Sequence, residues 1–342
     1  MMSRLFGTLG LASMMVGLAL ADDKPPAQSP STRDLVKQAQ EAASDNLPKG
    51  ITILETALKA APDDREALYL LGAMSAFRGE QSQDKAERVA TFRKATDSFA
   101  RLRKLYPKST PYEKAFFERS RLVEARTLAL EGKPAESLAA IKAAMAGGFD
   151  DFDAIQSEDD LESVRKLPEL KGLIDSAYEA KVSQVKKGLA AEMAGQKTFP
   201  FDFELKDTDE KTVSLADFKG KVTIVDVWGT WCPPCRKEIP HFVDLYKTYK
   251  AKGLEIVGIN CNEEGSRDEI KKTIKDFAAK NRMEYRCVLN DEKTEAKIPG
   301  FQGYPTTLFL DQSGKVRLTL VGYTPKARLE AIITTLMAEG KP

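Results

Sequence analysis

The sequence predicts two domains: an all-α, repeat-like N-terminal domain and an α/β C-terminal domain. Three observations lead to this prediction. The chain has 342 residues, which is too long for one ordinary domain. Residues 34–194 are rich in Ala, Leu, Lys, Arg and Glu, with apolar residues three and four positions apart, as in amphipathic helices. From residue 195 onward, short β-type runs alternate with helical segments, which is the pattern of an α/β sheet.

The composition narrows the classes of function. The chain carries 52 Lys and Arg against 51 Asp and Glu, so its formal charge is +1. Nucleic acid or an anionic membrane surface is not expected as the main partner, because both require a basic stripe. The single histidine excludes a multi-histidine metal site within one monomer. All four cysteines lie between Cys232 and Cys287, so sulfur chemistry is confined to the C-terminal domain.

Residues 1–21 have the pattern of a secretory signal peptide. Arg4 precedes an uncharged apolar run that ends in a small-x-small cleavage site at Ala21. The alternative is an uncleaved anchor, since this run of 17 residues reaches the lower limit for a spanning helix. The Pro- and Ser-rich residues 22–33 are expected to form a disordered linker. The protein is therefore expected to be exported, to a periplasm or another extracytoplasmic space.

The helical region 34–194 contains a repeat-like junction within residues 50–75. Small residues at Ala57 and Gly72 would let two helices approach closely, and Pro62 would end the first of them. The residues that match the spacing of a tetratricopeptide repeat junction are Leu54, Ala57, Pro62, Leu68, Leu71 and Gly72. The region therefore resembles a short tetratricopeptide array of about three helix pairs. The alternative is a plain helical bundle with no groove.

The rest of the helical region is less regular. A further helix is expected at residues 95–107, and the 45 residues from Pro62 to Pro107 exceed the 34 of the repeat. A polar insert at residues 79–87 would take up the excess. The remaining helices are expected at residues 112–131, 135–146 and 147–173, the last being an acidic closing helix. Stacked helix pairs would form a concave face that binds a protein or peptide partner.

Alternating and continuous apolar runs predict the elements of the C-terminal domain, residues 195–342. Strands are expected at residues 199–205, 212–215, 221–227, 254–260, 285–289, 304–311 and 316–321. Helices are expected from the Cys232 region to about residue 250, at residues 268–281 and at residues 326–338. The last two strands would form a hairpin that turns at Gln312-Ser313-Gly314.

The segment Cys232-Pro233-Pro234-Cys235 directly follows the buried-type strand 221–227 and opens the next helix. A sulfur at a helix N-terminus is favoured as a thiolate by the orphan amide groups and the macrodipole. Cys232 is therefore the predicted exposed, acidic nucleophile, and Cys235 is placed one turn later to attack the mixed disulfide and release the product. The two prolines lack amide hydrogens, which should make the pair less oxidising than a glycine-containing loop.

Two cysteines at this spacing can also be half of a zinc site, or a structural disulfide. A zinc site needs two further ligands, which Cys261, Cys287 or His241 would have to supply. His241 otherwise has the pattern of a surface helix residue. The flanking tryptophans and the direct step from strand to helix favour redox chemistry. No metal or other cofactor is expected beyond the redox-active pair of cysteines.

Four segments of the C-terminal domain resemble the sequence motifs of a known protein family. They are residues 215–221 (LADFKGK), 225–240 (VDVWGTWCPPCRKEIP), 303–311 (GYPTTLFLD) and 314–316 (GKV). Together they resemble the TlpA/ResA-like group of extracytoplasmic thiol-disulfide oxidoreductases, and the match covers essentially the whole domain. The resemblance implies a thioredoxin fold and an oxidoreductase activity.

The resemblance also implies roles for single residues. Pro305 would be a cis-proline facing the cysteines, with a trans turn proline as the alternative, and the backbone of Tyr304 would pair with substrate. Asp226 matches the buried acid below the cysteines in thioredoxin itself, a position at which many TlpA-like members differ, and it would have a raised pKa and move a proton for Cys235. Glu238 would be a functional acid or, alternatively, an exposed helix charge. The expected substrate-binding residues are Trp231, Pro233, Pro234, Tyr304 and Thr306.

Cys261 and Cys287 depart from the family pattern. Cys261 ends one expected strand and Cys287 lies within the next, and consecutive parallel strands are usually adjacent. The sequence leaves two alternatives for these cysteines: they form a structural disulfide, or they remain two buried free thiols. A second redox relay would require both thiols to be exposed.

The expected reaction is reduction of disulfides in exported protein clients, for example apocytochrome cysteines, with electrons from a membrane thiol carrier. A disulfide-forming oxidase is an alternative, because the direction depends on the reduction potential rather than on the motif. A peroxidase of the same fold would need a Pro-x-x-x-Thr-x-x-Cys segment, which the residues around Cys232 do not form. A scaffold that binds clients without turnover is a further alternative.

Overall fold

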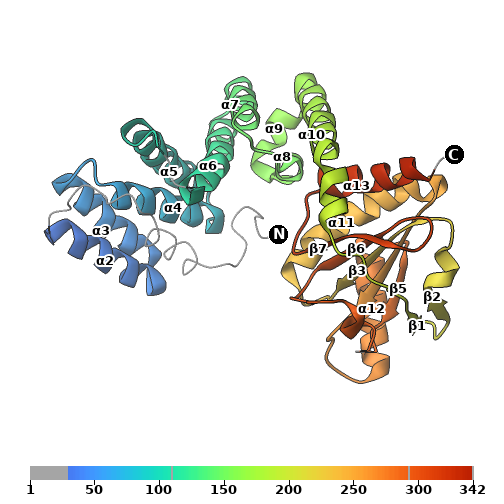
Figure 1. Cartoon of the computed structure of the whole chain (residues 1–342). Coiled ribbons are helices and arrows are strands. Elements are labelled where there is room, and N and C mark those ends of the chain that lie inside the picture. The colour runs from blue at the N-terminus through green and yellow to red at the C-terminus, as the bar shows by residue number, and fades with distance from the viewer. Residues whose placement is uncertain (1–29, 109–110, 292, 341–342) are drawn as a thin grey trace. The chain divides into compact units, whose positions relative to one another are not determined.

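The computed structural model describes residues 30–108, 111–291 and 293–340, and the expected signal peptide lies outside them (Figure 1). The chain divides into two compact units, Met1–Ala177 and Tyr178–Pro342. The described part of the first unit is helical and the second unit contains a mixed sheet, so the predicted fold class is confirmed. The division falls within helix α10 (Pro168–Gly195), earlier than the boundary expected at residue 195.

The described part of the first unit consists of helices, and from α2 to α7 each one packs on the next along the chain (Figure 1). The longer ones are α2 (Pro30–Asp45), α3 (Leu47–Ala60), α4 (Arg65–Gln81), α5 (Lys85–Leu105), α6 (Pro111–Leu130) and α7 (Pro134–Ala146). Short helices α8 (Phe152–Ser157) and α9 (Glu162–Arg165) precede α10. Because α2 begins at Pro30, the last residues of the expected linker 22–33 are helical.

Gly72 allows the close approach between α4 and α5. A Cβ atom at this position would come within 2.5 Å of the Phe99 ring, and Phe99 is fully buried. Any larger residue at position 72 would therefore push the two helices apart. The expectation from the sequence was a close approach of the two helices on either side of Pro62, whereas the structure places Gly72 against the next helix, α5.

Two expectations for the first unit differ from the structure. The insert expected at residues 79–87 is mostly helical, because α4 continues to Gln81 and α5 begins at Lys85. Asp84 caps α5 by accepting from the Glu87 amide, so the excess residues lengthen the helices instead of forming a loop. The segment 147–173, expected as one closing helix, breaks into α8, a 3₁₀ turn (Asp159–Leu161), α9 and the start of α10.

The break in this segment turns acidic side chains toward a buried arginine. Arg126 of α6 has no exposed surface and forms ion pairs with Asp160 (2.9 Å), Glu158 (3.4 Å) and Glu80. Arg88 of α5 also pairs with Asp160, at 2.5 Å. The cluster therefore joins three helices to the 3₁₀ turn. Burial, the largest effect, raises the pKa of Glu158 to about 7, although Arg126 opposes the shift.

The second unit contains a five-stranded sheet in the order β5-β4-β3-β6-β7. The strands are β3 (Val222–Trp228), β4 (Leu254–Asn260), β5 (Arg286–Leu289), β6 (Thr306–Leu310) and β7 (Val316–Val321). Strands β3, β4 and β5 are parallel, while β6 and β7 run antiparallel to their neighbours. A separate hairpin is formed by β1 (Glu204–Lys206) and β2 (Thr212–Ser214). The strand expected at 199–205 is shorter because Phe199, Phe201 and Phe203 pack in the core instead of pairing.

Each face of this sheet has its own core. On one face the sheet packs against α11 (Pro233–Tyr249), α12 (Arg267–Asn281), α13 (Lys326–Glu339) and the end of α10. The aromatic residues before β1 and the β1–β2 hairpin cover the other face. Leu189 and Met193 of α10 are buried in the first of these cores, so residues 178–195 belong structurally to the second unit.

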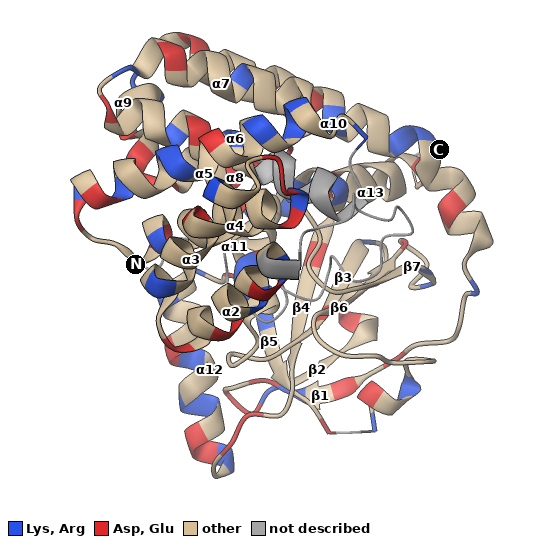
Figure 2. Ribbon diagram, turned by 90° about the vertical axis from the view of Figure 1, so that its left-hand side faces the viewer, with Lys and Arg blue, Asp and Glu red and all other residues tan. Residues whose placement is uncertain are grey.

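Residues of both charge signs occur along the helices. Figure 2 shows basic and acidic residues interspersed along helices such as α12. In the described part of the chain, no helix has the length and apolar content needed to cross a membrane.

Candidate active site

Cys232 is the N-cap residue of α11 and forms a disulfide with Cys235. The backbone N–H of Cys235 donates a hydrogen bond to Cys232 Sγ at 3.2 Å. Pro233 and Pro234 occupy the first helical positions, where no amide hydrogen is needed for the helix. The nucleophile predicted from the sequence therefore lies at the positive end of a helix, with an amide donor directed at its sulfur.

Aromatic side chains surround the disulfide, which is itself almost completely buried. Trp231 is 47% exposed, whereas Cys232 is only 2% exposed, so the prediction of an exposed Cys232 is wrong for the oxidised protein, in which the sulfur packs in the core with Cys235. The Trp231 ring makes an edge contact with Tyr304, the ring centroids lying 5.3 Å apart. The Tyr304–Pro305 peptide bond is cis. The structure thus brings the Trp231 segment and the proline loop together, although 73 positions separate Trp231 from Tyr304 in the sequence.

The other expected substrate-binding residues differ in exposure. Pro233 is exposed and Pro234 is half-buried, so both are near the surface beside the disulfide. Thr306 is fully buried, and its hydroxyl donates to the Gly303 carbonyl at 2.6 Å. The Thr306 side chain therefore stabilises the turn before Pro305 and does not face solvent.

Two buried carboxyl groups lie in the core that contains the disulfide. Asp226 of β3 is 1% exposed, and its Oδ1 has no hydrogen-bond partner among the described residues. Glu238 of α11 is fully buried, which decides against the alternative of an exposed helix charge, and its Oε1 accepts from the Thr324 amide at 2.8 Å. Burial raises the pKa of Asp226 to about 8. Burial and then the negative charge of Asp226 raise the pKa of Glu238 well above its usual range.

His241 does not lie on the surface as its pattern suggested. The residue is 5% exposed, and its ring packs against Tyr323 with centroids 5.7 Å apart. The reason is helical geometry: Glu238 and His241 are three residues apart on α11 and share the face that packs on the core.

Cys261 and Cys287 are free, buried thiols. The register pairs Cys287 with Gly258, which precedes Cys261 by three positions, so the two cysteines are about 10 Å apart along the strands. A disulfide needs Cα atoms within about 7 Å. The odd offset also places them on opposite faces of the sheet, in different cores. The structural disulfide is therefore not formed, and these thiols cannot complete one tetrahedral zinc site with Cys232 and Cys235.

Several residues beside the disulfide were not identified from the sequence. Glu263 binds the backbone and side chain of Thr230, and Asn262 donates to the Tyr304 hydroxyl at 2.8 Å. The Tyr304 hydroxyl in turn donates to Glu295 at 2.7 Å. Asn262 and Glu263 could have been identified from their position in the sequence, because they follow the carboxyl end of the buried parallel strand β4. Polar residues at such positions often line a site.

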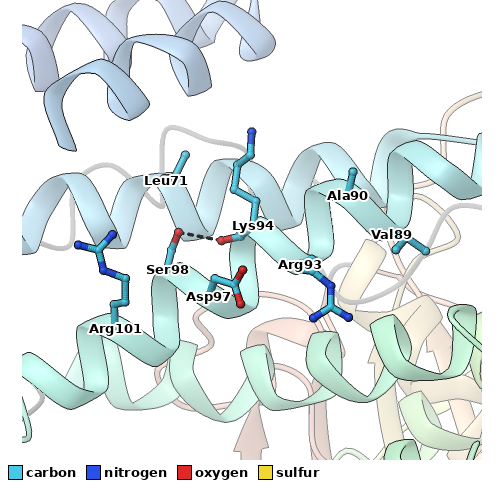
Figure 3. Close-up of a pocket in the computed structure, with 8 residues that line it drawn as sticks. All are labelled: Leu71, Val89, Ala90, Arg93, Lys94, Asp97, Ser98 and Arg101. Atoms are coloured by element: carbon cyan, nitrogen blue, oxygen red, sulfur yellow. Dashed lines mark hydrogen bonds between the residues drawn. The ribbon is translucent and has the colours of Figure 1, made fainter. Parts of the chain in front are cut away.

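The described residues also line two open cavities away from the disulfide. One, of about 420 Å³, lies between the β1–β2 turn, α12 and β5 and reaches Cys287. The other, of about 400 Å³, lies on α5 of the helical unit (Figure 3). Its lining combines an apolar part with the charged residues Arg93, Lys94, Asp97 and Arg101.

Comparison with known proteins gives consistent results for the second unit. Residues 196–319 match the AhpC/TSA family. The chain is 33% identical over 129 residues to the thiol-disulfide oxidoreductase ResA of Bacillus thuringiensis, a match that covers 38% of this chain and 71% of that protein. It is also 33% identical over 121 residues to ResA of Bacillus subtilis, covering 35% of this chain and 64% of that one.

Solved structures are similar over the same part of the chain. A thiol:disulfide interchange protein of the thioredoxin family from Chlorobium tepidum is 30% identical. That similarity covers 42% of this chain and 98% of the other, with a TM-score of 0.37.

Proposed function

Because the chain belongs to the ResA family of thiol-disulfide oxidoreductases, we propose that it reduces disulfides in exported protein clients. The observation that carries this proposal is the Cys232–Cys235 disulfide at the N-terminus of α11, next to the cis-proline loop. In the proposed reaction, the Cys232 thiolate attacks a client disulfide and forms a mixed disulfide. Cys235 then attacks Cys232, which releases the reduced client and leaves the enzyme oxidised.

The surroundings of the disulfide support a role for the exposed aromatic surface in client binding. Trp231 is one of the large hydrophobic residues that remain exposed in the described chain, and it lies against Tyr304. An extended client segment would pair with the backbone at Tyr304 and place its sulfur over Cys232.

Proton transfer is assigned to the two buried acids. Since their pKa values are raised by burial, Asp226 and Glu238 carry protons at a pH at which exposed carboxyl groups do not. A protonated acid in the core of the disulfide could protonate the Cys235 sulfur when the internal disulfide opens, and a carboxylate could accept that proton in the reverse direction.

Reduction of clients requires a source of electrons, and we propose a membrane thiol carrier for this step. Apocytochrome cysteines are one class of client that fits such a system. The two prolines between the cysteines support the reducing direction, because they leave fewer amide donors to stabilise the reduced thiolate of Cys232.

The helical unit is proposed to bind a protein partner, as a tetratricopeptide-like array would. The packing of consecutive helices and the glycine contact between α4 and α5 support the repeat-like arrangement. The cavity on α5 in Figure 3 is a candidate contact region for this partner. We also propose that residues 1–21 either direct export of the protein as a cleaved signal peptide or anchor it to the membrane.

The proposal is tested by the equilibrium reduction potential of the Cys232–Cys235 pair, with Trp231 fluorescence as the readout. A potential near about −270 mV would support a reductase, and one near about −120 mV would make the protein a disulfide-forming oxidant. Reduction of insulin disulfides that is lost in Cys232→Ser would exclude a scaffold without turnover. Failure of the wild-type protein to reduce insulin and to show a reversible transition would contradict the proposed redox function.

A further inference from the structure

The loop after β4 contacts both segments that form the active site. We call residues 260–263, which are the last residue of β4 and the three residues after it, the bridge loop. Glu263 is half-buried, and its carboxylate accepts three hydrogen bonds. Its Oε1 accepts from the Thr230 amide (2.6 Å) and from Asn260 Nδ2 (3.0 Å), and its Oε2 accepts from Thr230 Oγ1 (2.7 Å). Thr230 is thus bound through its backbone and its side chain, two residues before Cys232.

The neighbouring residues of the bridge loop extend this connection. The Cys261 carbonyl accepts from Trp231 Nε1 at 3.1 Å, and the Cys261 amide donates to the Trp228 carbonyl at 2.8 Å. Asn262 has a φ of 55°, a left-handed conformation that asparagine tolerates, and its amide reaches the Tyr304 hydroxyl at 2.8 Å. The loop therefore connects the segment before Cys232 to the segment before Pro305.

We propose that Glu263 is a positioning residue for thiol-disulfide exchange. Its carboxylate holds Thr230 against the end of β4, while the Cys261 carbonyl holds the Trp231 ring, and the fixed position of Thr230 sets the direction from which Cys232 Sγ meets a client disulfide. This inference rests on the proposed function, because it assigns Glu263 to the attack by Cys232.

Glu263 takes no part in the changes of bonding. A bond forms between Cys232 Sγ and one client sulfur as the client S–S bond breaks, and the other client sulfur leaves as a thiolate that takes a proton from water. The Cys235 thiol then gives its proton to one of the two buried acids in its carboxylate form, and its sulfur bonds to Cys232 Sγ. This displaces the first client sulfur as a thiolate, which takes a proton from water. Two electrons pass from the cysteine pair to the client.

The number and type of these hydrogen bonds suit a positioning role. Bonds to a carboxylate are stronger than bonds between neutral groups, and a two-point contact fixes orientation as well as distance. The attack on a disulfide depends on alignment of the reacting atoms, and a displacement of about 1 Å can slow such a step about a hundredfold. Loss of the Glu263 contacts is therefore expected to affect the reaction more than it affects the global fold.

Three variants distinguish the effect of the Glu263 hydrogen bonds from the effect of its negative charge. Glu263→Ala removes all three hydrogen bonds, whereas Glu263→Gln removes the charge but can still accept from the Thr230 amide and donate to Thr230 Oγ1. Glu264→Ala is the matched control, because Glu264 is exposed and adjacent in sequence. For the reduced proteins, we would measure the rate of attack on a small aromatic disulfide and the pH profile of Cys232 alkylation.

We expect Glu263→Ala to attack the disulfide about tenfold more slowly, and Glu263→Gln and Glu264→Ala to stay within about twofold of the wild type. The midpoint of the alkylation profile should shift to higher pH in Glu263→Ala only, since a looser loop weakens the amide contact of Cys235 with Cys232. A wild-type rate and profile in Glu263→Ala would overturn the inference. An equal loss in Glu263→Gln and Glu263→Ala would overturn it too, because charge alone would then be responsible.

A second variant and a measurement that needs no client are added, so that the test still gives an answer if Glu263→Ala does not fold or if the protein does not reduce insulin. If Glu263→Ala does not fold, Thr230→Val removes only the hydroxyl contact and should slow the attack severalfold, and a wild-type rate in that variant would overturn the inference. Alkylation of Cys232 needs no client. A wild-type protein that alkylates normally but does not reduce insulin would therefore contradict the proposed function while still reporting on Glu263.

Discussion

The carboxyl groups of Asp226 and Glu238 lie near each other in one buried region, so that the charge of Asp226 raises the pKa of Glu238. One acid comes from β3 and the other from the helix that begins at Cys232. Burial and the proximity of two like charges therefore both favour the protonated form of these carboxyl groups. The core that contains the disulfide thus holds two carboxyl groups with raised pKa values.

Asp226→Asn should stabilise the protein at high pH. The pKa of Asp226 in the folded chain, about 8, exceeds the value for an unfolded chain, so the folded state binds the additional proton between about pH 4 and pH 8. The stability of the wild type should therefore fall as pH rises through this window. The variant should gain of the order of a few kcal/mol at pH 8 and little at pH 4. Urea unfolding at both pH values checks this.

The control for this experiment is Asp276→Asn, which changes a surface carboxyl on α12 that pairs with Lys272. It should change the free energy of unfolding by less than about 0.5 kcal/mol at either pH. An Asp226→Asn variant that is less stable than the wild type at pH 8 would contradict the buried, protonated state.

Cys235→Ser should trap a mixed disulfide between Cys232 and a client. The nucleophile remains, but no second thiol is placed to resolve the intermediate. Cys232→Ser should trap none, because the nucleophile is lost. Non-reducing electrophoresis after mixing each reduced variant with insulin measures the adduct. Cys287→Ala, which removes a buried thiol on another element, should resolve the adduct like the wild type.

The oxidised protein should contain two titratable thiols after denaturation without reductant, since Cys261 and Cys287 are free. Full reduction should raise the number to four. In the folded protein both should react slowly, because burial raises the pKa of Cys287 to about 12 and raises that of Cys261 further. A count of zero free thiols in the denatured, oxidised chain would mean that a second disulfide forms.

Glu158→Gln should reduce the pH dependence of the stability of the helical unit. The pKa of Glu158 in the folded state, about 7, exceeds the ordinary 4.5, so stability present below pH 4.5 is lost as pH rises through 7. The variant should be more stable than the wild type at pH 8, by about 1–3 kcal/mol. Thermal unfolding between pH 5 and pH 8 checks the slope. The exposed Glu162→Gln should leave the slope unchanged.

A chain that begins at residue 178 should be more stable than one that begins at residue 196. The shorter chain loses Leu189 and Met193, whose burial in the core of the second unit contributes about 1.5–3 kcal/mol each. Guanidinium unfolding of the two chains gives the difference. In the full-length protein, Leu189→Ala should cost about 2–5 kcal/mol, and the exposed Lys186→Ala should cost almost nothing. Equal stability of the two shortened chains would place the domain boundary at residue 195.

The parts of the site that lie within a few residues of one another could be predicted from the sequence. Cys232 and Cys235 follow a buried strand and begin a helix, so local spacing alone places one sulfur at the N-cap and the other a turn later. In the helical unit the same kind of local signal, Pro62 after an apolar-periodic run, predicted the end of a helix, and α3 ends at Ala60. Helix propensity and the alternation of apolar residues depend on neighbours in the chain, which the sequence displays directly.

The parts that depend on register or on distant partners could not be predicted. Whether Cys261 meets Cys287 depends on how β5 pairs with β4, and a shift of one position would reverse the face of every side chain. The break of the segment 147–173 depends on Arg126, which is buried and pairs with Asp160 of the 3₁₀ turn and with Glu158 beside it. Glu263 acquires its role only because the ends of β3 and β4 are neighbours in the sheet.

The amino-acid sequence by itself determined the two-unit organisation and the place of the two cysteines at the start of a helix, because these follow from local patterns of apolar residues and from the step from strand to helix. Only the tertiary structure decided which acids are buried, which cysteines remain free and which loop lies beside Cys232. The physical reason is that burial, pKa shifts and side-chain hydrogen bonds arise between residues far apart in the chain. Their strength depends on the exclusion of water by the assembled core.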